Sequence, residues 1–473
     1  MALDVGRQAA PEKPRRQAAP EKPRRQAGTP DRLRRQAAPD DTPRRQGVPG
    51  RTARMRRSAL WPARLESPLA PYYLVLGSTV ALVVVGLVMV LSSSSVESLK
   101  DTNLHSSYAV FVKQALFAAI GAPAAWIASR IPVSGWERLA WPLAVGSVLL
   151  LCLVPFIGTS IGGNQNWIVV GGFTLQPSEL AKLALLVWAA AVLSAKQHLL
   201  HQVPHALVPV VPGAGLMVLL VLLGNDLGTS MILMAVLFGV LFVGGAPLRA
   251  FATTFVGGLA VVAVLVAVSP NRLGRIGSWL GMDGGTAGGY FSDAWQSTHS
   301  TFALATGGWW GVGLGASKEK WLWLPEAHND FIFAIIGEEL GLPGTIAVLA
   351  LFAMLGVGLL RLVQTSEDLF VKIATGGVLL WVVGQAAVNI GAVLGMLPVI
   401  GVPLPLVSSG GSALVTTMVA LGMVLGFARR VPGAPDALTA RPGLVRRSLA
   451  VLPRRAGAVA TRHRSAGPRG GAR

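Results

Sequence analysis

The sequence predicts an all-α polytopic membrane protein of about ten transmembrane helices, with a large extracytoplasmic loop and two disordered basic tails. Only 13% of the 473 residues are charged and 52% are hydrophobic, whereas soluble domains carry about 25% charged residues. Ten apolar runs follow one another between residues 72 and 428, each near the roughly 20 residues that cross a bilayer. The net charge of +19 belongs to the two ends of the chain, because the 362 residues between them carry 13 basic and 14 acidic side chains.

The first 66 residues form the N-terminal tail. They hold 17 Lys/Arg against 7 Asp/Glu, with frequent prolines and few apolar residues, so they cannot bury a core. The tripeptide Arg-Arg-Gln recurs at 15–17, 24–26, 34–36 and 44–46. We therefore predict that residues 1–66 are a disordered basic cytoplasmic tail with Arg-Arg-Gln repeats.

The C-terminal tail, residues 431–473, is rich in Arg, Pro, Gly and Ala, and it is predicted to be disordered for the same reason. Basic tails favour the anionic lipids of the inner leaflet, by about 1 kcal/mol for each Lys or Arg close to the surface. Nucleic acid is the rival partner for arginine runs of this kind. We do not expect it, because basic flanks are already what the topology of a membrane protein requires.

The predicted membrane domain covers residues 67–430. Its ten expected helices lie near 72–91, 109–128, 139–157, 178–194, 206–223, 227–243, 251–268, 345–360, 373–394 and 412–428. Lysine and arginine mark the loops at one side of these helices, whereas the short loops at the other side carry only Lys100. The positive-inside rule therefore places both termini in the cytoplasm and the large loop, about 269–328, outside.

The eighth apolar stretch, from Phe331 to Leu360, is too long for one simple span. It contains the sequence Gly341-Leu-Pro-Gly344, whose glycines and proline weaken a helix. We expect the helix to break there, which leaves residues 330–340 as a short half-helix embedded at the outer side.

Asp330 stands immediately before this half-helix. An ionisable residue near the membrane is costly, so Asp330 is a candidate for function. One interpretation is an N-cap, in which the carboxylate accepts from the first free N–H groups of the helix. The other is a general base in a partly desolvated cleft, with His328 as a neighbour. Glu338 and Glu339 are expected at the membrane interface, one of them paired with a buried cation.

The sequence Gln176-Pro-Ser-Glu-Leu-Ala-Lys182 opens the fourth span. Pro177 suits a first helical turn, and Glu179 in that turn complements the helix dipole. Lys182 lies one turn deeper on the same face, so the two charges can neutralise each other or hold a phosphate and a hydroxyl of a ligand. Asp226, in the tight turn before the sixth span, either caps the next helix or orients Lys182.

A Ser/Gly turn precedes the last span and follows a proline-rich irregular segment. Irregular backbone at membrane depth persists only where it is buried in protein or lines a wet cavity. Such a turn, entering a helix N-terminus, is a natural anion site, although a plain helix cap is the alternative. The candidate phosphate-binding residues are Ser408, Ser409, Gly410, Gly411 and Ser412.

Histidine and cysteine give no sign of a metal site. His198, His201 and His205 share one loop without the spacing of metal ligands, so no zinc site is expected. Cys152, the one cysteine, lies inside a hydrophobic run and is expected to be a small buried apolar residue.

Taken together, these segments resemble the SEDS family of bacterial cell-wall proteins, FtsW and RodA, over about residues 70–430. The stretch Gly395–Ser412 looks like the signature of that family. Pro325–Phe333 is similar to the motif that ends in the family's essential aspartate, which corresponds to Asp330. Trp295–Leu314, which contains Gln296, resembles the part of the large outer loop before that motif.

The chain departs from the family pattern at three asparagines. Asn329 stands where the family usually has Thr, and Asn225 stands where the family often has Pro. Asn166 stands before Trp167, where many members carry Arg, so the first large outer loop lacks that cation.

The resemblance implies a peptidoglycan glycosyltransferase that polymerises lipid II at the outer face of the bacterial cytoplasmic membrane. Asp330 would deprotonate the 4-hydroxyl of the acceptor sugar, and the anomeric carbon of the donor would lose its lipid pyrophosphate with inversion. Glu179, Lys182, Asp226, Gln296, His328 and the turn 408–412 would bind substrate. A divalent cation, Mg²⁺ or Mn²⁺, is a third candidate to neutralise the diphosphate beside Lys182 and the turn. The implied partners are a class B penicillin-binding protein, which is a transpeptidase, and other membrane proteins of the division machinery.

Within the family the division type at the septum is favoured over the RodA-type elongation polymerase. The His-Asn-Asp sequence ending at Asp330 and the stretch Lys318–Trp321 support that preference, and the composition suggests a high-GC bacterium. Two rival functions are a lipid II flippase and a catalytically silent scaffold of the division machinery. The ionisable residues cluster at one side of the membrane, which argues against the flippase.

Overall fold

The computed structural model describes residues 67–94, 107–161, 164–171, 173–268, 277, 293–321 and 323–434. The predicted tail 1–66, most of the predicted tail 431–473 and much of the first half of the loop 269–328 lie outside the described residues.

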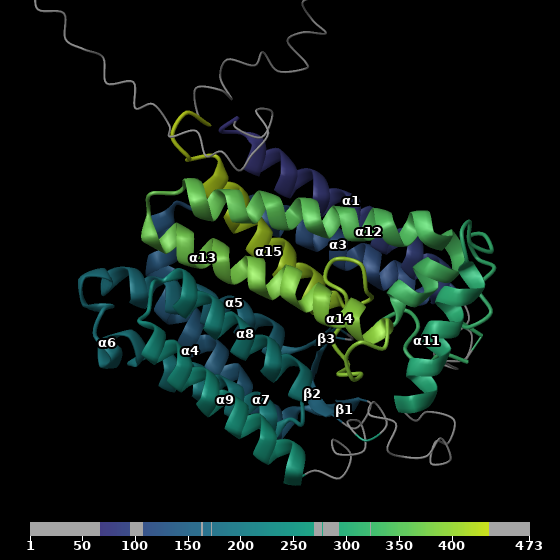
Figure 1. Cartoon of the computed structure of the whole chain (residues 1–473), viewed down its shortest axis with the longest axis horizontal. Helices are drawn as coiled ribbons and strands as arrows, with labels where there is room; N and C mark the ends of the chain where they lie inside the picture. The colour runs from purple at the N-terminus through teal and green to yellow at the C-terminus, as the bar shows by residue number, and fades with distance from the viewer. Residues whose placement is uncertain are drawn as a thin grey trace, which may run out of the picture. The chain divides into compact units, whose positions relative to one another are not determined.

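The described residues form mainly α-helices, which are labelled in chain order (Figure 1). The helices are α1 (Ala70–Ser93), α3 (Ala109–Ala128), α4 (Val133–Ile157), α5 (Pro177–Ala195), α6 (Val203–Leu207), α7 (Val210–Leu223), α8 (Leu227–Val243), α9 (Leu248–Val268), α11 (Asp293–Gly307), α12 (Ile332–Thr365), α13 (Leu369–Leu379), α14 (Gln385–Val393) and α15 (Gly411–Ala428). A 3₁₀ turn covers Gln197–Leu199, and a π-helical segment, Leu380–Gly384, joins α13 to α14.

The helices confirm the predicted fold class. Among the described residues, eight helical stretches are long and apolar enough to cross a membrane, and α8 and α9 are two shorter apolar helices. Two of the eight are composite, because α6 runs into α7 and α13 continues through the π segment into α14. Each of the ten predicted runs therefore coincides with a helix.

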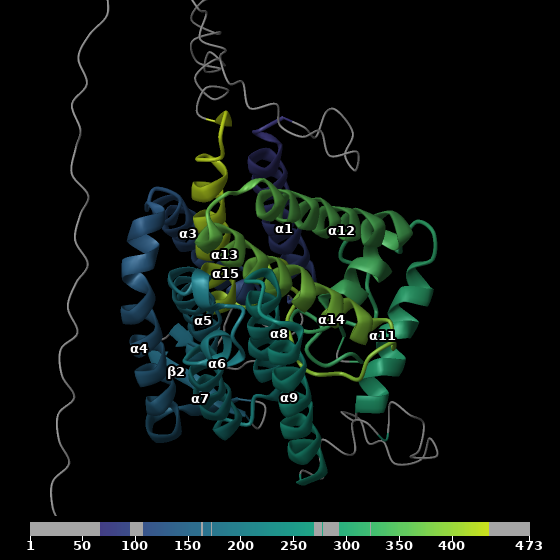
Figure 2. The same cartoon turned by 60° about the vertical axis from the view of Figure 1, so that its left-hand side comes forward.

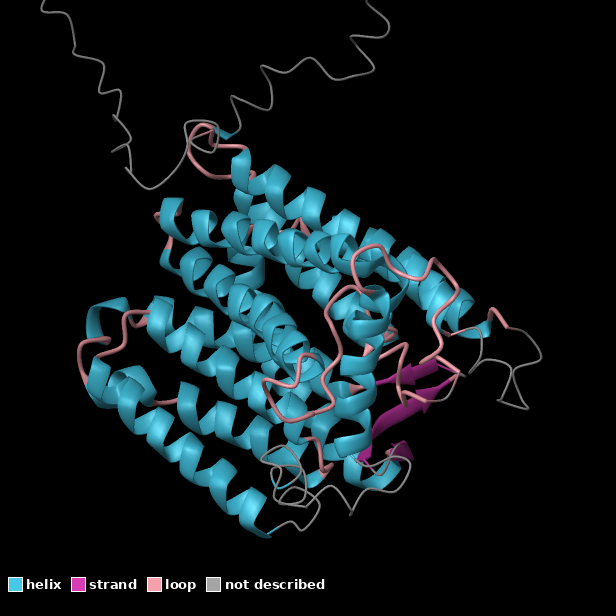
Figure 3. Ribbon diagram, turned by 45° about the vertical axis from the view of Figure 1, so that its right-hand side comes forward, coloured by secondary structure: helices cyan, strands magenta, loops and turns pink. Residues whose placement is uncertain are grey.

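A small antiparallel sheet is a feature that the all-α prediction did not contain. Its strands are β1 (Thr159–Ile161), β2 (Asn164–Val170) and β3 (Phe173–Leu175), in the order β1-β2-β3. Ile168 pairs with Leu175 and Thr159 with Trp167. Figure 3 shows the strands beside the long loops at one end of the helices. The strands lie between the end of α4 and the start of α5, where the chain is extended. Their backbone N–H and C=O groups pair across neighbouring strands instead of within a helix.

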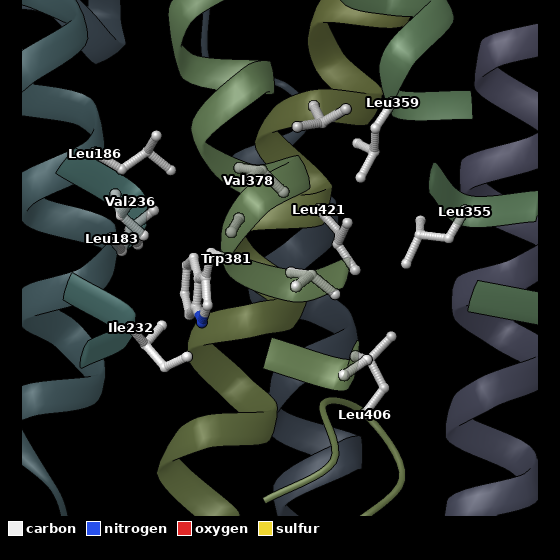
Figure 4. Close-up of a cluster of buried hydrophobic side chains, with 14 of the residues drawn as sticks. Leu183, Leu186, Ile232, Val236, Leu355, Leu359, Val378, Trp381, Leu406 and Leu421 are labelled. Atoms are coloured by element: carbon white, nitrogen blue, oxygen red, sulfur yellow. The ribbon is translucent and has the colours of Figure 1, made fainter. Parts of the chain in front are cut away.

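The core lies between α13 and α15 and the helices around them. Both views show α13 with α12 and α1 on one side and α5 and α8 on the other (Figures 1 and 2), and these elements contact one another directly. In Figure 4, Leu183 and Ile232 face Trp381 from one side, while Leu355 and Leu421 lie on the other. Helix α5 is buried almost all round, because its alanines let neighbouring helices approach closely.

The outer helices present apolar side chains outward. On α4, Leu149 and Leu153 are exposed, as expected for a face that meets lipid tails. Cys152 lies on this face and is exposed, so the expectation that it is buried was wrong. The hydrophobic run that contains it is a peripheral span rather than a core helix, and a thiol is apolar enough for that position.

The predicted break in the eighth span is confirmed. Gly341 interrupts α12 with φ 66° and ψ −159°. A Cβ at Gly341 would also lie 2.4 Å from the backbone nitrogen of Gly311 and 2.8 Å from the carbonyl oxygen of Trp309. Glycine is required there both for its positive φ and for this close approach. The half-helix Ile332–Leu340 is thereby set off from the rest of α12.

Glu338 and Glu339, predicted to lie at the membrane interface, are buried within the protein at the end of the half-helix. The predicted pairing with a cation is confirmed, because Glu339 Oε1 lies 3.0 Å from Lys320 Nζ. Glu338 accepts from the Ser317 hydroxyl at 2.5 Å and from the Lys318 backbone N–H at 2.8 Å. The loop after α11 folds back over the half-helix and supplies these partners.

Candidate active site

The starts of α5, α8, α12 and α15 meet at the end of the molecule that carries the sheet. Gln176 Nε2 donates to Asp226 Oδ2 at 3.0 Å, and the Gln176 backbone N–H donates to Ser412 Oγ at 3.3 Å. The Ser409 backbone N–H donates to the carbonyl oxygen of His328 at 3.0 Å. Four segments singled out in the sequence are therefore in direct contact.

Asp330 is half-buried and lines a small, partly open pocket at this end. The pocket walls also include Phe331, Asn389, Gly401 and Val402. Helix α12 begins at Ile332 and its N-cap residue is Phe331, so the interpretation of Asp330 as the N-cap was wrong. The carboxylate belongs to the loop that precedes the helix and borders the pocket. A group in this place is suited to take a proton from a ligand in the pocket.

Gly401 forms the wall nearest the Asp330 carboxylate. Its φ is 74°, and a Cβ at this position would lie 3.5 Å from Asp330 Oδ2. The missing side chain leaves space beside Oδ2 that a larger residue would fill.

The serine turn holds the main chain of the Asp330 loop in place. Ser408 Oγ donates to the carbonyl oxygen of Asn329 at 2.6 Å and accepts from the Leu404 N–H at 2.8 Å. Gln114 closes the turn from α3, because its Nε2 donates to the Ser408 carbonyl and its Oε1 accepts from the Gly410 N–H. The Ser408 hydroxyl and the backbone N–H groups of Ser409 and Gly410 are therefore all bonded within the protein.

The anion site predicted at residues 408–412 therefore has fewer free hydrogen-bond donors than expected. Helix α15 begins at Gly411, and the N–H groups of a first helical turn have no carbonyl partner inside their own helix. These N–H groups are therefore the donors that remain for an anion at the turn. Ser412 is buried and its hydroxyl accepts from Gln176.

Glu179 and Lys182 form a buried ion pair. Lys182 Nζ lies 2.8 Å from Glu179 Oε1, and the two side chains are 1% and 3% exposed. Lys182 also donates to Gln385 Oε1 at 3.1 Å, and Nζ lies 5.3 Å from the centre of the Trp381 ring. Of the two roles that the sequence left open, this geometry favours mutual neutralisation over capture of a ligand's phosphate.

Asp226 does not orient Lys182, which was one of the two roles left open for it. Its carboxylate accepts from the Thr229 N–H at 2.8 Å and so caps α8, while its other oxygen accepts from Gln176. Asp226 is not among the hydrogen-bond or ion-pair partners of Lys182, both residues being in the described part of the chain. A short cap bond within the turn is available locally, and Glu179 on the same helix already serves Lys182.

His328 and Gln296 take different places. His328 is half-buried in the Asp330 loop, and its carbonyl oxygen is held by Ser409. Gln296 is half-buried on α11, which packs on α12. The described residues give Gln296 no hydrogen bond to the other predicted site residues.

Three polar side chains of the site were given no role by the sequence reasoning. Gln114, Gln385 and Asn389 are each at most 3% exposed, and all three donate to backbone carbonyls of the irregular segments near Asp330. The sequence signal that could have identified these residues is an uncharged amide side chain within an otherwise apolar helical run. Asn166, the departure from the family pattern in the first outer loop, has a structural role. With its amide oriented so that both its oxygen and its nitrogen have suitable partners, its NH₂ group donates to the Gly224 carbonyl at 2.7 Å.

Comparisons with known proteins agree with the fold. The family described as cell cycle protein, which groups FtsW, RodA and SpoVE, matches residues 73–431. A Mycobacterium tuberculosis protein named probable peptidoglycan glycosyltransferase FtsW is 38% identical over 380 residues, covering 80% of this chain and 71% of the relative. A Marinobacter nauticus protein with the same name is 37% identical over 76% of this chain and 90% of its own.

Solved structures give the same result. A chain from a structure titled as a peptidoglycan synthase complex that coordinates polymerization and crosslinking is 27% identical, with a TM-score of 0.60 over 76% of this chain and 98% of that one. The Thermus thermophilus rod shape determining protein RodA is 27% identical, with a TM-score of 0.54 over 76% of this chain and 97% of that one. From the family match and the identity to these relatives, the chain belongs to the FtsW, RodA and SpoVE family of cell cycle proteins.

Proposed function

We infer that this chain is a peptidoglycan glycosyltransferase, which polymerises lipid II into glycan strands during cell division. The relatives quoted above carry that activity in their names. The single observation on this chain that carries the inference is the Asp330 carboxylate, which borders a pocket and whose loop is held by the Ser408 turn.

The reaction requires one base. Asp330 takes the proton from the 4-hydroxyl of the acceptor sugar, and that oxygen forms a bond to the anomeric carbon of the donor. The bond from this carbon to the pyrophosphate oxygen breaks with inversion, and the lipid pyrophosphate leaves. Gly401 leaves room beside the carboxylate for the acceptor hydroxyl.

The departing pyrophosphate gains negative charge that must be stabilised. Lys182 is a poor candidate, because Glu179 already neutralises it and it is 1% exposed. The first-turn N–H groups of α15 are the remaining donors that this chain offers.

A divalent cation, Mg²⁺ or Mn²⁺, would supply further charge if it arrived with the diphosphate. Among the described residues, no group of three or more His, Cys, Asp or Glu stands ready to hold one without the diphosphate. We derive no step through it, and chelation of a purified polymerisation reaction tests its contribution.

We place the site at the outer face of the bacterial cytoplasmic membrane, with both termini in the cytoplasm. The distribution of Lys and Arg in the loops supports that orientation. The crosslinking partner would be a class B penicillin-binding protein, by analogy with the synthase complex whose fold this chain shares. Other division proteins and inner-leaflet lipids, through the tails, complete the proposed partners, and the septum is the proposed place of action.

The division role is preferred over RodA-type elongation. The quoted FtsW relatives are 37–38% identical to this chain, whereas the quoted RodA structure is 27% identical. A flippase and a silent scaffold remain as outcomes of the test that follows.

The test is polymerisation of purified lipid II by the wild type and by Asp330→Asn, each with its penicillin-binding partner and with crosslinking blocked. General bases contribute about 10²–10⁴-fold, so we expect the variant to lose at least about a hundredfold in rate. Asp368→Asn is the matched control, because Asp368 caps α13 and asparagine is an equally good cap. Equal rates for wild type and Asp330→Asn would remove the base, and a wild type that flips lipid II without polymerising it would favour the flippase.

A further inference from the structure

The ninth span carries a row of buried side chains that leads to Asp330. Trp381 lies in the π segment, and Gln385 and Asn389 follow at intervals of four residues on α14. Their exposed fractions are 0%, 2% and 3%. Residues four apart on an α-helix share a face, so Gln385 and Asn389 point the same way. A π segment changes the rotation of the helix that follows it, and such segments are frequent at functional sites.

The row connects two parts of the site that are separate in sequence. At its first end, Trp381 and Gln385 both contact the ammonium of Lys182. In the middle, Gln385 Nε2 donates to the carbonyl oxygen of Pro403 at 2.8 Å. At its other end, Asn389 Nδ2 donates to the carbonyl oxygens of Val402 at 2.8 Å and Asp330 at 2.7 Å.

The chemistry of these contacts fixes the orientation of the Asn389 amide. A carbonyl oxygen can only accept, so the group that faces both carbonyls must be the NH₂. Each of its two hydrogens then serves one carbonyl, and both donors are used. The two carbonyls belong to two non-helical segments that both contribute to the walls of the Asp330 pocket. Asn389 is therefore a bridge that sets the distance between those walls.

The bridge has no simple substitute in this environment. Water is scarce among membrane helices, so a backbone carbonyl that loses its donor there is costly. Ser408 holds the carbonyl of Asn329 from another side, which means that consecutive carbonyls before α12 are held by different elements. The contact from Asn389 acts on the backbone of Asp330 itself.

We propose that Asn389 is a positioning residue that holds the backbone of Asp330 against Val402 and so sets where the carboxylate stands in the pocket. The proposal rests on the proposed function, because it assigns Asn389 a part in the reaction of Asp330. It goes beyond that function by identifying what aligns the base.

The first test compares Asn389→Leu with Thr375→Val. Leucine has the same branching and the same number of side-chain heavy atoms as asparagine and suits an apolar helix, but it donates nothing. Thr375 is a matched control on the same span, because it is fully buried and its hydroxyl has no hydrogen-bond partner among the described residues. We expect Asn389→Leu to lower kcat by about ten- to a hundredfold with KM within about twofold, since misplacement of a group by about 1 Å costs that much. Thr375→Val should leave both unchanged.

The second test asks whether Asn389 acts through Asp330. In an Asp330→Glu background the base is already displaced, so Asn389→Leu should cost much less than it costs in the wild type. Losses that multiply fully would show that Asn389 acts independently of the base, and they would overturn the proposal.

The third test needs no activity and separates failure of this proposal from failure of the proposed function. Hydrogen–deuterium exchange of a peptide covering 326–331 should accelerate in Asn389→Leu and not in Thr375→Val. Unchanged exchange would overturn the positioning role even if the enzyme polymerises lipid II. Accelerated exchange in a protein that makes no polymer would instead keep the alignment of Asp330 and refute the polymerase.

Discussion

At the scale of single residues, Lys182 shows how a charge is kept inside this membrane protein. Its ammonium is enclosed by α5, the π segment and the start of α14, where it meets a carboxylate, an aromatic ring and an amide oxygen. Glu179 lies one turn earlier on α5 and cancels the charge. Breaking such a buried pair by removing one partner leaves an uncompensated charge, whereas removing both partners does not.

We therefore expect opposite outcomes for single and double substitutions of this pair. Lys182→Met alone should lower the free energy of unfolding by about 3–5 kcal/mol, because Glu179 is left charged and buried. Adding Glu179→Gln should recover most of that loss. Thermal unfolding of the purified variants in detergent measures both effects.

The activity of the double variant gives a further distinction. If the pair is structural, a stable double variant should polymerise lipid II at a rate close to that of the wild type. A double variant as stable as the wild type but inactive would show that Lys182 binds the substrate after all.

At the scale of elements, α12 is divided at Gly341 so that a half-helix can start at the pocket. The loop after α11 lies across this division, and Gly311 touches Gly341 through backbone atoms. The ion pair between Lys320 and Glu339 and the hydrogen bond from Ser317 to Glu338 fasten the loop to the half-helix. These contacts fix the half-helix directly behind Asp330.

Gly341→Ala should disrupt this arrangement. A positive φ costs a residue with a Cβ about 1–2 kcal/mol, and the added methyl group would also collide with the backbone of Gly311. We expect a clear fall in thermal stability and loss of polymerisation.

Gly146→Ala on α4 is the comparison, because a Cβ there meets nothing within 4 Å. This substitution should leave stability unchanged or slightly raised, since alanine favours a helix more than glycine does. Equal behaviour of the two variants would contradict the structural role assigned to Gly341.

At the scale of the whole membrane domain, the polar groups of the site gather at the end that carries the sheet. The opposite ends of the helices carry basic residues such as Lys196 and Arg249. This asymmetry predicts which end faces the cytoplasm. A site that uses lipid II for glycan strands must face outward.

Labelling of single cysteines tests that orientation. With Cys152→Ser as background, Val169→Cys in β2 should react with a membrane-impermeant maleimide in intact cells, because Val169 is half exposed at the site end. Gln197→Cys, at the far end of α5 and exposed, should react only after the membrane is opened. The reverse pattern would place Asp330 in the cytoplasm and refute the outward-facing site.

The sequence by itself determined the spans and the break at Gly341, and it singled out Asp330 as the candidate base. These features are local, because hydropathy, helix-breaking residues and a motif are all read from neighbouring positions. The family resemblance extended that knowledge to the reaction, since it too rests on short segments in a fixed order.

Only the tertiary structure decided which polar groups serve one another. Asn389 reaches Asp330 across 59 positions of the chain, and Gln114 reaches Ser408 across 294. In the folded chain, Asp226 caps α8 and does not contact Lys182. The Ser408 turn holds the loop of Asp330, and Cys152 is exposed on the outer face of α4. A buried amide or carboxylate takes whichever donor or acceptor the packed helices bring near it, and one chain position does not specify that neighbour.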